Sequence, residues 1–407
     1  MTRLALRLVW GAAVIGLLFP MFRLSVAAEP IRLGAAVSLT GSLAKLGQET
    51  KAGYEIWMEQ INAAGGLNLG GSKRPVEIIF YDDQSDANRA TKLVEKLISE
   101  DNIRLILGPY SSGITLSVST ITEKNHAVLI SAGGNADELF ERNFRYIFGI
   151  WPLASEPIQA TLDVIHRTDP QLKTVGIAVK DNLFPLTAAR GAREKAKQLG
   201  YTVVFDEKYP AEMNDFSSVI GKAKDVSPDI LLELGHVKEA ILFLKQAKEL
   251  GFSPKAWTLQ AGPETPDFKQ ALGAAANYVF WYALWSPAVP YNDPAFGSTQ
   301  AYVAAYQAKF KTNPTFNSAA ATAGAELLGL AIEKANSIEP DPVRDALRTF
   351  KGETIMGPTE FDKRGVSIHA RENVVVYQIQ NGEDVIVSPE KVSQKKPQLP
   401  MPGWAQR

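Results

Sequence analysis

The 407-residue chain contains no cysteine. Disulfides, thiolate metal sites and cysteine nucleophiles are therefore excluded, and so is a lipid anchor on an N-terminal cysteine. Lysine and arginine together number 43, and aspartate and glutamate 44, which leaves a net charge of −1. The sequence has neither a basic cluster nor a long acidic tail, so it gives no indication of nucleic-acid binding.

Sequence motifs of common enzyme classes are also missing. There is no G-x-S-x-G, no G-x-x-x-x-G-K-[ST], and no G-x-G-x-x-G after a strand. The four histidines are far apart in the sequence, and none forms a metal-binding pair at helical spacing. Asp82 and Asp83 end a predicted strand and would point to opposite faces, so we expect a loop cap rather than an acid/base pair. We therefore expect no catalytic activity, no metal and no cofactor.

The N-terminus has the pattern of a secretory signal. Arg3 and Arg7 precede an apolar run over residues 8–22, and the segment Ser25–Ala28 ends in small residues suited to a signal peptidase. The run is shorter than the roughly 20 residues of a spanning helix, so cleavage after Ala28 is favoured over an uncleaved membrane anchor. We expect general secretion and, in a Gram-negative source, a periplasmic protein without a lipid anchor.

The mature chain alternates predicted strands and helices, and the pattern restarts in its middle. Predicted strands lie at 31–37, 76–81, 103–107, 128–130, 174–179, 202–206 and 230–234. Predicted helices lie at 54–61, 87–100, 187–199, 215–226 and 237–250. This alternation predicts parallel sheets covered by helices on both faces. Because the chain is too long for one typical core, two domains are expected, with a ligand in the cleft at the carboxyl ends of the strands.

The last third of the chain is different. After a strand-like aromatic segment at 277–284, helices are predicted at 294–311, 317–336 and 341–350. A terminal hairpin is expected to turn at Asn381-Gly382, a strong turn signal. Residues 391–407 contain three prolines and are expected to form a loose tail.

A small-residue loop from Ser38 lies between the first predicted strand and a helix that ends at Gly65-Gly66. Apolar residues at Tyr54, Trp57 and Ile61 give this helix one buried face. Strand, loop and helix in this order often bind an anion. The sequence therefore points to the loop as part of a ligand site.

Five short motifs occur in one order along the chain. They are Leu39-Thr-Gly41 with Gly47, Ile61-Asn-Ala-Ala-Gly-Gly66, Tyr81-Asp-Asp83, Leu107-Gly-Pro109 with Ser111-Ser112, and Ser131-Ala-Gly-Gly134. Together they resemble the periplasmic solute-binding proteins of branched-chain amino acid ABC transporters, the leucine/isoleucine/valine-binding type. The resemblance covers nearly all of the mature chain.

The resemblance implies a type I periplasmic-binding-protein fold. Two Rossmann-like α/β lobes with parallel sheets would be joined by a three-strand hinge and would close on the ligand. The expected crossings lie near 149–152, 275–279 and 353–357. The implied division is a signal peptide at 1–28, lobe one at 29–149 and 279–355, lobe two at 150–278 and 356–390, and a C-terminal tail at 391–407.

The resemblance also implies ligand-binding residues on lobe one. Leu46 stands where the family has a cleft tyrosine, so the pocket would differ from that of a leucine binder. Ser112 matches the serine that binds the ligand carboxylate, although it could be a solvated turn serine. Gly133 and Asn135 match the second arm of this clamp, and Asn135 could equally cap a helix. Trp151, at the first crossing, is the aromatic residue expected in the pocket rather than in the core.

On lobe two, Phe184 and His236 stand at positions where the family has tyrosines. His236 could also be a surface residue at a helix start. The partner of a ligand ammonium is either Gln260, by direct counting, or Glu264, by its Gly-Pro-Glu motif. Glu264 would favour an α-amino acid, whereas Gln260 would leave a buried ammonium without a counter-charge and favour a plain carboxylate or amide.

The leading hypothesis is a binding protein that captures an amino acid or a related small carboxylate and delivers it to an ABC transporter permease. The alternatives are a binder of aromatic or other organic acids or amides, and a ligand-sensing receptor module of the same fold. A secreted enzyme is disfavoured by the missing motifs. A monomer is expected because the hinge must move freely.

Overall fold

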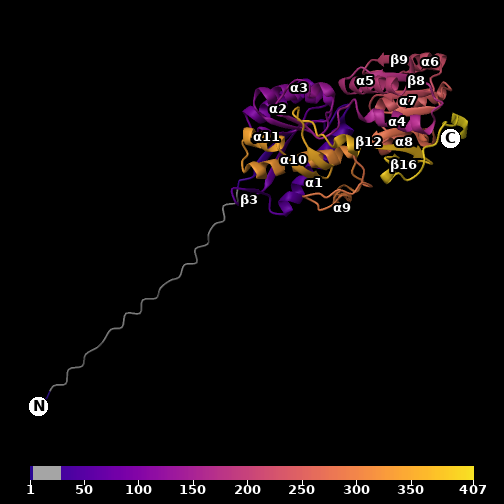
Figure 1. The fold of residues 1–407 in the computed structure, drawn as a ribbon. Helices are drawn as coiled ribbons and strands as arrows, with labels where there is room; N and C mark the ends of the chain where they lie inside the picture. Colours follow the sequence, from indigo (N-terminus) through magenta and orange to yellow (C-terminus); the bar gives the residue numbers. More distant parts are fainter. Residues whose placement is uncertain (3–28) are drawn as a thin grey trace.

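The computed structural model describes residues 1–2 and 29–407. The expected signal peptide therefore lies, apart from its first two residues, outside the described residues. In the part of the chain that is described, no helix is both long enough and apolar enough to cross a membrane. The described residues from 29 onwards form two lobes side by side, with the C-terminus on the second lobe (Figure 1).

Lobe one is built on a five-stranded parallel sheet in the order β4-β1-β5-β6-β7. Its strands are β1 Ile31–Val37, β4 Val76–Asp82, β5 Leu105–Leu107, β6 Val128–Ser131 and β7 Ile147–Gly149. The helices that follow the first strands are α1 Ala44–Ala63, α2 Ala87–Ser99 and α3 Ser112–Lys124. A small hairpin, β2 Leu67–Leu69 and β3 Ser72–Arg74, follows α1. Strands β5, β6 and β7 are buried at every position, as expected of a parallel sheet covered on both faces.

Lobe two has a seven-stranded sheet in the order β16-β15-β12-β11-β10-β8-β9. Its strands are β8 Thr174–Lys180, β9 Thr202–Tyr209, β10 Ile230–Leu234, β11 Ala256–Leu259, β12 Phe280–Ala283, β15 Val375–Gln380 and β16 Glu383–Ser388. Its helices are α4 Pro157–Thr168, α5 Leu183–Gln198, α6 Ser217–Val226, α7 Val237–Glu249 and α8 Pro266–Leu272. The predicted terminal hairpin is β15–β16, and it turns through Asn381 and Gly382 at φ of 54° and 80°. Asn and Gly adopt positive φ angles more readily than other residues, which explains why this pair forms the turn.

Two boundaries between the lobes differ from those expected. β12 pairs with β11 and β15, so the chain leaves lobe two after Ala283 rather than at 278. It then returns to lobe one with α9 Thr299–Phe310, α10 Phe316–Ala335 and α11 Pro340–Arg348. The hairpin β13 Lys351–Thr354 and β14 Gly357–Glu360 follows, and Val366 still bridges to Gly149 of β7. The third crossing therefore lies between Ser367 and β15, not at 353–357.

The C-terminal segment is not the loose tail that its prolines suggested. The Met401 amide donates to the Lys255 carbonyl at 2.8 Å, and Trp404 Nε1 donates to the Phe252 carbonyl at 2.8 Å. The side chains of Gln378 and Gln380 bind carbonyls of residues 398 and 396. Because its backbone groups find partners and Met401 is buried, the segment is an integral part of lobe two.

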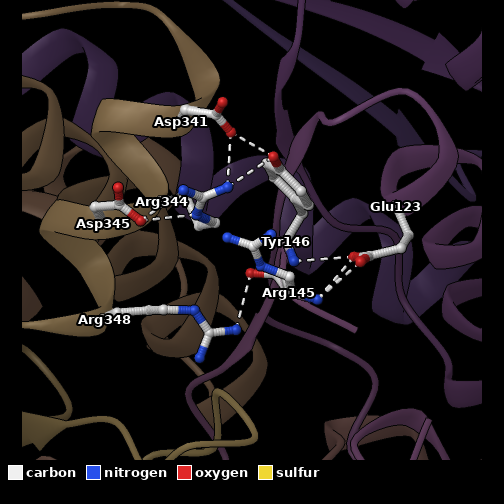
Figure 2. A network of polar contacts seen from close by, with 7 residues as sticks. All are labelled: Glu123, Arg145, Tyr146, Asp341, Arg344, Asp345 and Arg348. Carbon is white, nitrogen blue, oxygen red and sulfur yellow. Dashed lines mark hydrogen bonds and ion pairs between the residues drawn. The ribbon is translucent and has the colours of Figure 1, made fainter. Parts of the chain in front are cut away.

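A polar network fastens α11 to the lobe-one sheet (Figure 2). Arg344, which is 6% exposed, donates through Nη1 to the Tyr146 hydroxyl and to Asp341, both at 2.7 Å. Its Nη2 lies 2.7 Å from Asp345, and Tyr146 donates to Asp341. Glu123 accepts the backbone amides of residues 145 and 146 from the other side. One arginine thus joins two carboxylates of α11 to the loop that leads into β7.

Replacing Arg344 by methionine should lower the melting temperature by about 2–6 °C. The change leaves the Tyr146 hydroxyl without its donor and the two aspartates without their cation, although their exposure moderates the loss. Differential scanning fluorimetry measures the shift. The control is Lys351→Met, since Lys351 forms an exposed ion pair with Glu360 and should change the melting temperature by less than about 1 °C. Equal shifts in the two variants would show that this network does not fasten α11.

Candidate functional site

The small-residue loop after β1 is held by the two aspartates that end β4. Asp82 Oδ1 accepts the amides of Leu39 and Thr40 at 2.9 and 3.2 Å, and Asp83 accepts the Ser38 hydroxyl at 2.6 Å. The aspartates thus cap the loop, as the sequence predicted. Because these amides already bind a carboxylate of the protein, the loop does not offer them to an external anion.

Ser112 lies at the first turn of α3, directly after a strained residue. Ser111 has a φ of 98°, a conformation that costs about 1–3 kcal/mol and is concentrated at functional sites. The Ser112 hydroxyl oxygen accepts the amides of Asn135 and Ala136, both at 3.0 Å. Its own hydrogen remains available to a ligand. Gly133 packs so close that a Cβ there would lie 2.9 Å from the Tyr110 Cα, so the site requires glycine.

Asn135 is buried, and its amide is oriented by the first crossing. Nδ2 donates to the Pro152 carbonyl at 2.8 Å. Oδ1 has no partner among the described residues. One N–H of the Asn135 amide is thus engaged, and its free Oδ1 is an acceptor that suits an ammonium. Asn135 does not cap the following 3-10 turn, whose N-cap position is Ala136.

Trp151 lies in the first crossing between the lobes. It is 5% exposed, and its ring centroid lies 5.7 Å from that of Phe316, at the start of α10. Its Nε1 has no hydrogen-bond partner in the described chain. The indole nitrogen is therefore a buried donor without an acceptor in the described chain.

His236 ends the β10 loop of lobe two and is held as a neutral ring. Its amide donates to Glu239 Oε2 at 3.2 Å, and Glu239 Oε1 pairs with Lys180 at 3.0 Å. Burial, with the Lys180 charge as the next cause, lowers the pKa of His236 to about 4. The ring stacks on Phe184 at 5.9 Å between centroids, and its Nδ1 has no partner in the described residues.

Gln260 and Glu264, which the sequence offered as alternatives, both lie in the segment between β11 and α8. Gln260 follows β11, is 4% exposed, and has no described partner for either Nε2 or Oε1. The Tyr282 hydroxyl on β12 is buried beside the Gln260 side chain, and neither group makes a hydrogen bond of good geometry in the described chain. Glu264 accepts the Gly262 amide at 2.6 Å, and burial is the main cause that raises its pKa to about 8. The site therefore combines a neutral amide with a carboxyl group that is protonated at neutral pH while no cation is near.

A cavity of about 840 Å³ opens beside Glu264. It lies between α1 of lobe one and the start of α8, β12 and β16 of lobe two. Lys45, Gln48 and Glu49 line it from α1, whereas Leu46 of the same helix is 3% exposed in the core and does not line it. The cleft role expected for Leu46 is thus not supported by this cavity, and Glu49, three residues on, lines it instead.

The lobes touch each other on both sides of this space. Thr187 of α5 donates to Glu138 of lobe one at 2.8 Å, and Arg190 pairs with Asp137 at 2.9 Å. Lys45 of α1 lies 4.0 Å from Asp267 of α8. The unpartnered polar atoms of Asn135, Trp151, His236, Gln260 and Tyr282 are buried.

Sequence reasoning missed Glu49, which lines the cavity. Glu49 lies one helical turn after Leu46, so the i, i+3 spacing was an available signal. Among residues 1–2 and 29–407, no group of three or more His, Cys, Asp or Glu side chains could hold a metal ion.

Known proteins share the sequence pattern of this chain. The sequence matches the periplasmic binding protein family over residues 30–384. The Leu/Ile/Val-binding protein homolog 8 of Brucella suis is 27% identical over 406 residues, which covers 95% of this chain and 97% of the relative. The matched part thus includes both lobes.

Two solved structures share the fold. The branched-chain amino acid transporter substrate-binding protein LivJ from Streptococcus pneumoniae, in complex with isoleucine, has a TM-score of 0.77 at 23% identity, covering 89% of this chain and 100% of that one. A solute-binding protein of an ABC transporter from R. palustris, in complex with benzoate, has a TM-score of 0.74 at 18% identity, covering 88% and 96%. These similarities confirm the predicted two-lobed α/β fold. The chain belongs to the periplasmic binding protein family, a family of solute-binding proteins.

Proposed function

We propose that this protein is the extracytoplasmic solute-binding component of an ABC importer. It takes an amino acid or a related small carboxylate between its lobes and delivers it to the permease. The observation that carries the proposal is the set of buried polar atoms without partners between the lobes. They belong to Asn135, Trp151, His236, Gln260 and Tyr282.

These atoms make an unliganded closed state costly. Each buried polar group without a hydrogen bond costs about 1–3 kcal/mol, and native proteins keep few of them. Here they come from both lobes, and those of Asn135, His236 and Gln260 lie at positions where the resemblance implies ligand-binding residues. A polar solute that met these atoms would remove the cost and hold the lobes together. The same groups therefore explain both binding and closure.

The two ends of the site suit the two ends of an amino acid. On lobe one, the Ser112 hydroxyl and the first amides of α3 offer donors to a carboxylate. On lobe two, Glu264 offers a carboxyl group to an ammonium, whose charge would return its pKa toward the ordinary range. Asn135 Oδ1 adds an acceptor for the same ammonium. Because Glu264 lies at the cleft, an α-amino acid is the better candidate.

An aromatic carboxylate is the second candidate. The stacked rings of Phe184 and His236 and the face of Trp151 would suit a flat ligand. The neutral amide of Gln260 would suit a ligand without an ammonium. The relative from R. palustris was crystallised with benzoate, so the fold accommodates such a solute.

A thermal-shift screen of the mature protein, refolded to strip bound ligand, separates the two candidates. The panel holds the standard amino acids beside benzoate-type, phenylpropenoate-type and small aliphatic carboxylates. A ligand at about 100 times its dissociation constant stabilises by about 2.7 kcal/mol, so a shift of several degrees with α-amino acids and a change in tryptophan emission are expected. Shifts only with plain carboxylates would overturn the amino acid assignment. No shift with any member, or turnover of a bound one, would overturn the proposed function.

A further inference from the structure

Two carboxylates from opposite lobes face the cavity beside the buried polar atoms. Glu264 lines it from the loop before α8, and Glu49 lines it from α1. Glu49 Oε2 accepts the Thr315 hydroxyl at 2.7 Å and Asn317 Nδ2 at 3.2 Å. These bonds fix the Glu49 carboxylate on the wall opposite Glu264. Closure of the lobes brings two acidic groups to one cavity.

Neither carboxylate has an ion-pair partner among the described residues. The two lysines that line the cavity are engaged elsewhere, Lys45 with Asp267 at 4.0 Å and Lys269 with Asp384. Lys45 is half exposed, so it only partly offsets the charge of Glu49. Burial is the main cause that raises the pKa of Glu49 and of Glu264, and the charge of Glu49 raises that of Glu264 further. A bound cation would therefore neutralise the acidic charge of the cavity.

A second, independent observation points to a ligand here. The Trp281 indole, on a residue only 6% exposed, lines the cavity, and its Nε1 has no hydrogen-bond partner in the described chain. The cavity walls are also aromatic, with Trp281, Trp285, Tyr306, Phe310, Phe316 and Tyr377. Aromatic faces attract cations, and guanidinium groups stack on them best. A volume of about 840 Å³ leaves room for an extended side chain beyond an α-amino acid head.

We propose that the solute is a basic α-amino acid or a guanidino analogue, with its α-ammonium at Glu264 and its side-chain cation between the aromatic wall and Glu49. This inference rests on the proposed function and names the ligand class of the same site. The carboxylate end of the site offers neutral donors, so it adds no positive charge. A neutral amino acid would pair with one acidic group and leave the other without a counter-charge. A basic amino acid brings one cation for each.

The test compares arginine with citrulline, which has nearly the same shape and no side-chain charge. Isothermal titration calorimetry measures both on the stripped protein and on Glu49→Gln. The wild-type protein should bind arginine at least about tenfold more tightly than citrulline, and Glu49→Gln should remove most of this ratio. Glu59→Gln is the control, because Glu59 is exposed on the same helix, outside the cavity, and should leave the ratio unchanged.

The outcomes separate this inference from the proposed function. If citrulline or leucine binds as tightly as arginine, or if Glu49→Gln keeps the ratio, the basic-ligand inference is wrong while the solute-binding function stands. If no amino acid or carboxylate binds the stripped, refolded protein, both are wrong. If the wild-type protein prefers arginine to citrulline, Glu49→Gln lowers this preference and Glu59→Gln preserves it, the basic-ligand inference and the solute-binding function are both supported.

Discussion

Replacing Gln260 by leucine is expected to stabilise the ligand-free protein and, at the same time, to weaken ligand binding about 10- to 100-fold. The wild-type side chain is 4% exposed, and both its amide atoms lack partners, so an apolar side chain of similar size removes a desolvation cost. The melting temperature of the stripped protein should rise by about 2–5 °C. The ligand loses two hydrogen bonds in the same change. Opposite effects on stability and affinity would indicate that Gln260 is retained for ligand binding and not for stability.

Thr258→Val is the matched control for this prediction. Thr258 lies two residues earlier, in β11, is fully buried, and also has a hydroxyl without a described partner. Its removal should stabilise the protein without changing the affinity. If Gln260→Leu were destabilising, or if both variants kept full affinity, Gln260 would not belong to the ligand site. Thermal scans and titration of the same samples give both quantities.

Glu264→Gln is expected to weaken binding of an α-amino acid about 30-fold or more, because the buried ammonium loses its counter-charge. Binding of a plain carboxylate should change little. The selectivity of the site should therefore move from amino acids toward organic acids. Titration with one ligand of each kind measures the change in their ratio.

The same residue sets a pH dependence. Burial raises the pKa of Glu264 to about 8, so the ligand-free folded protein holds a proton that the unfolded chain releases above its ordinary pKa of 4.5. The contribution of Glu264 to stability is therefore present at low pH and falls as pH rises from 4.5 to 8. Binding an ammonium expels this proton, so amino acid affinity should rise with pH up to about 8. Glu264→Gln should flatten the binding profile and reduce the slope of the stability profile.

Asp267→Asn is the control for Glu264→Gln. Asp267 lies three residues on, at the exposed start of α8, where its charge is solvated. It should leave the amino acid selectivity and the pH profile of binding unchanged. The stability profile will keep part of its slope even in Glu264→Gln, because burial also raises the pKa of Glu233 to about 8. An affinity that does not depend on pH in the wild-type protein would argue against an ammonium at Glu264.

Hydrophobic patterns in the sequence predicted those strands and helices whose buried residues form a continuous apolar run or a clear period. Strands β8 and β10 are apolar runs because both faces of a parallel sheet are covered. Strands β7 and β11 have three and four residues, too few to show a period, and they were missed. β12 was predicted as a strand but assigned to the wrong side of the boundary. Its partner β15 is distant in the sequence, and nothing local encodes that pairing.

Candidate site residues could be named from the sequence where they lie in motifs that resemble those of the family. Asn135, His236 and Gln260 lie in loops that follow strands, Ser112 begins the helix after β5, and all four side chains are buried. The orientation of the Asn135 amide depends on Pro152, in the crossing, and could not be read from either segment alone. Glu49 and Glu264 line the same cavity only through the packing of one lobe against the other.

A crystal structure of the complex with the tightest ligand of the screen tests the central claim most directly. The account predicts the ligand between closed lobes, with its polar atoms within hydrogen-bond distance of Asn135 Oδ1, the Gln260 amide and Glu264. The buried atoms that now lack partners would then be satisfied. A ligand on the outer surface of either lobe, or one between the lobes that leaves these atoms without partners, would contradict it.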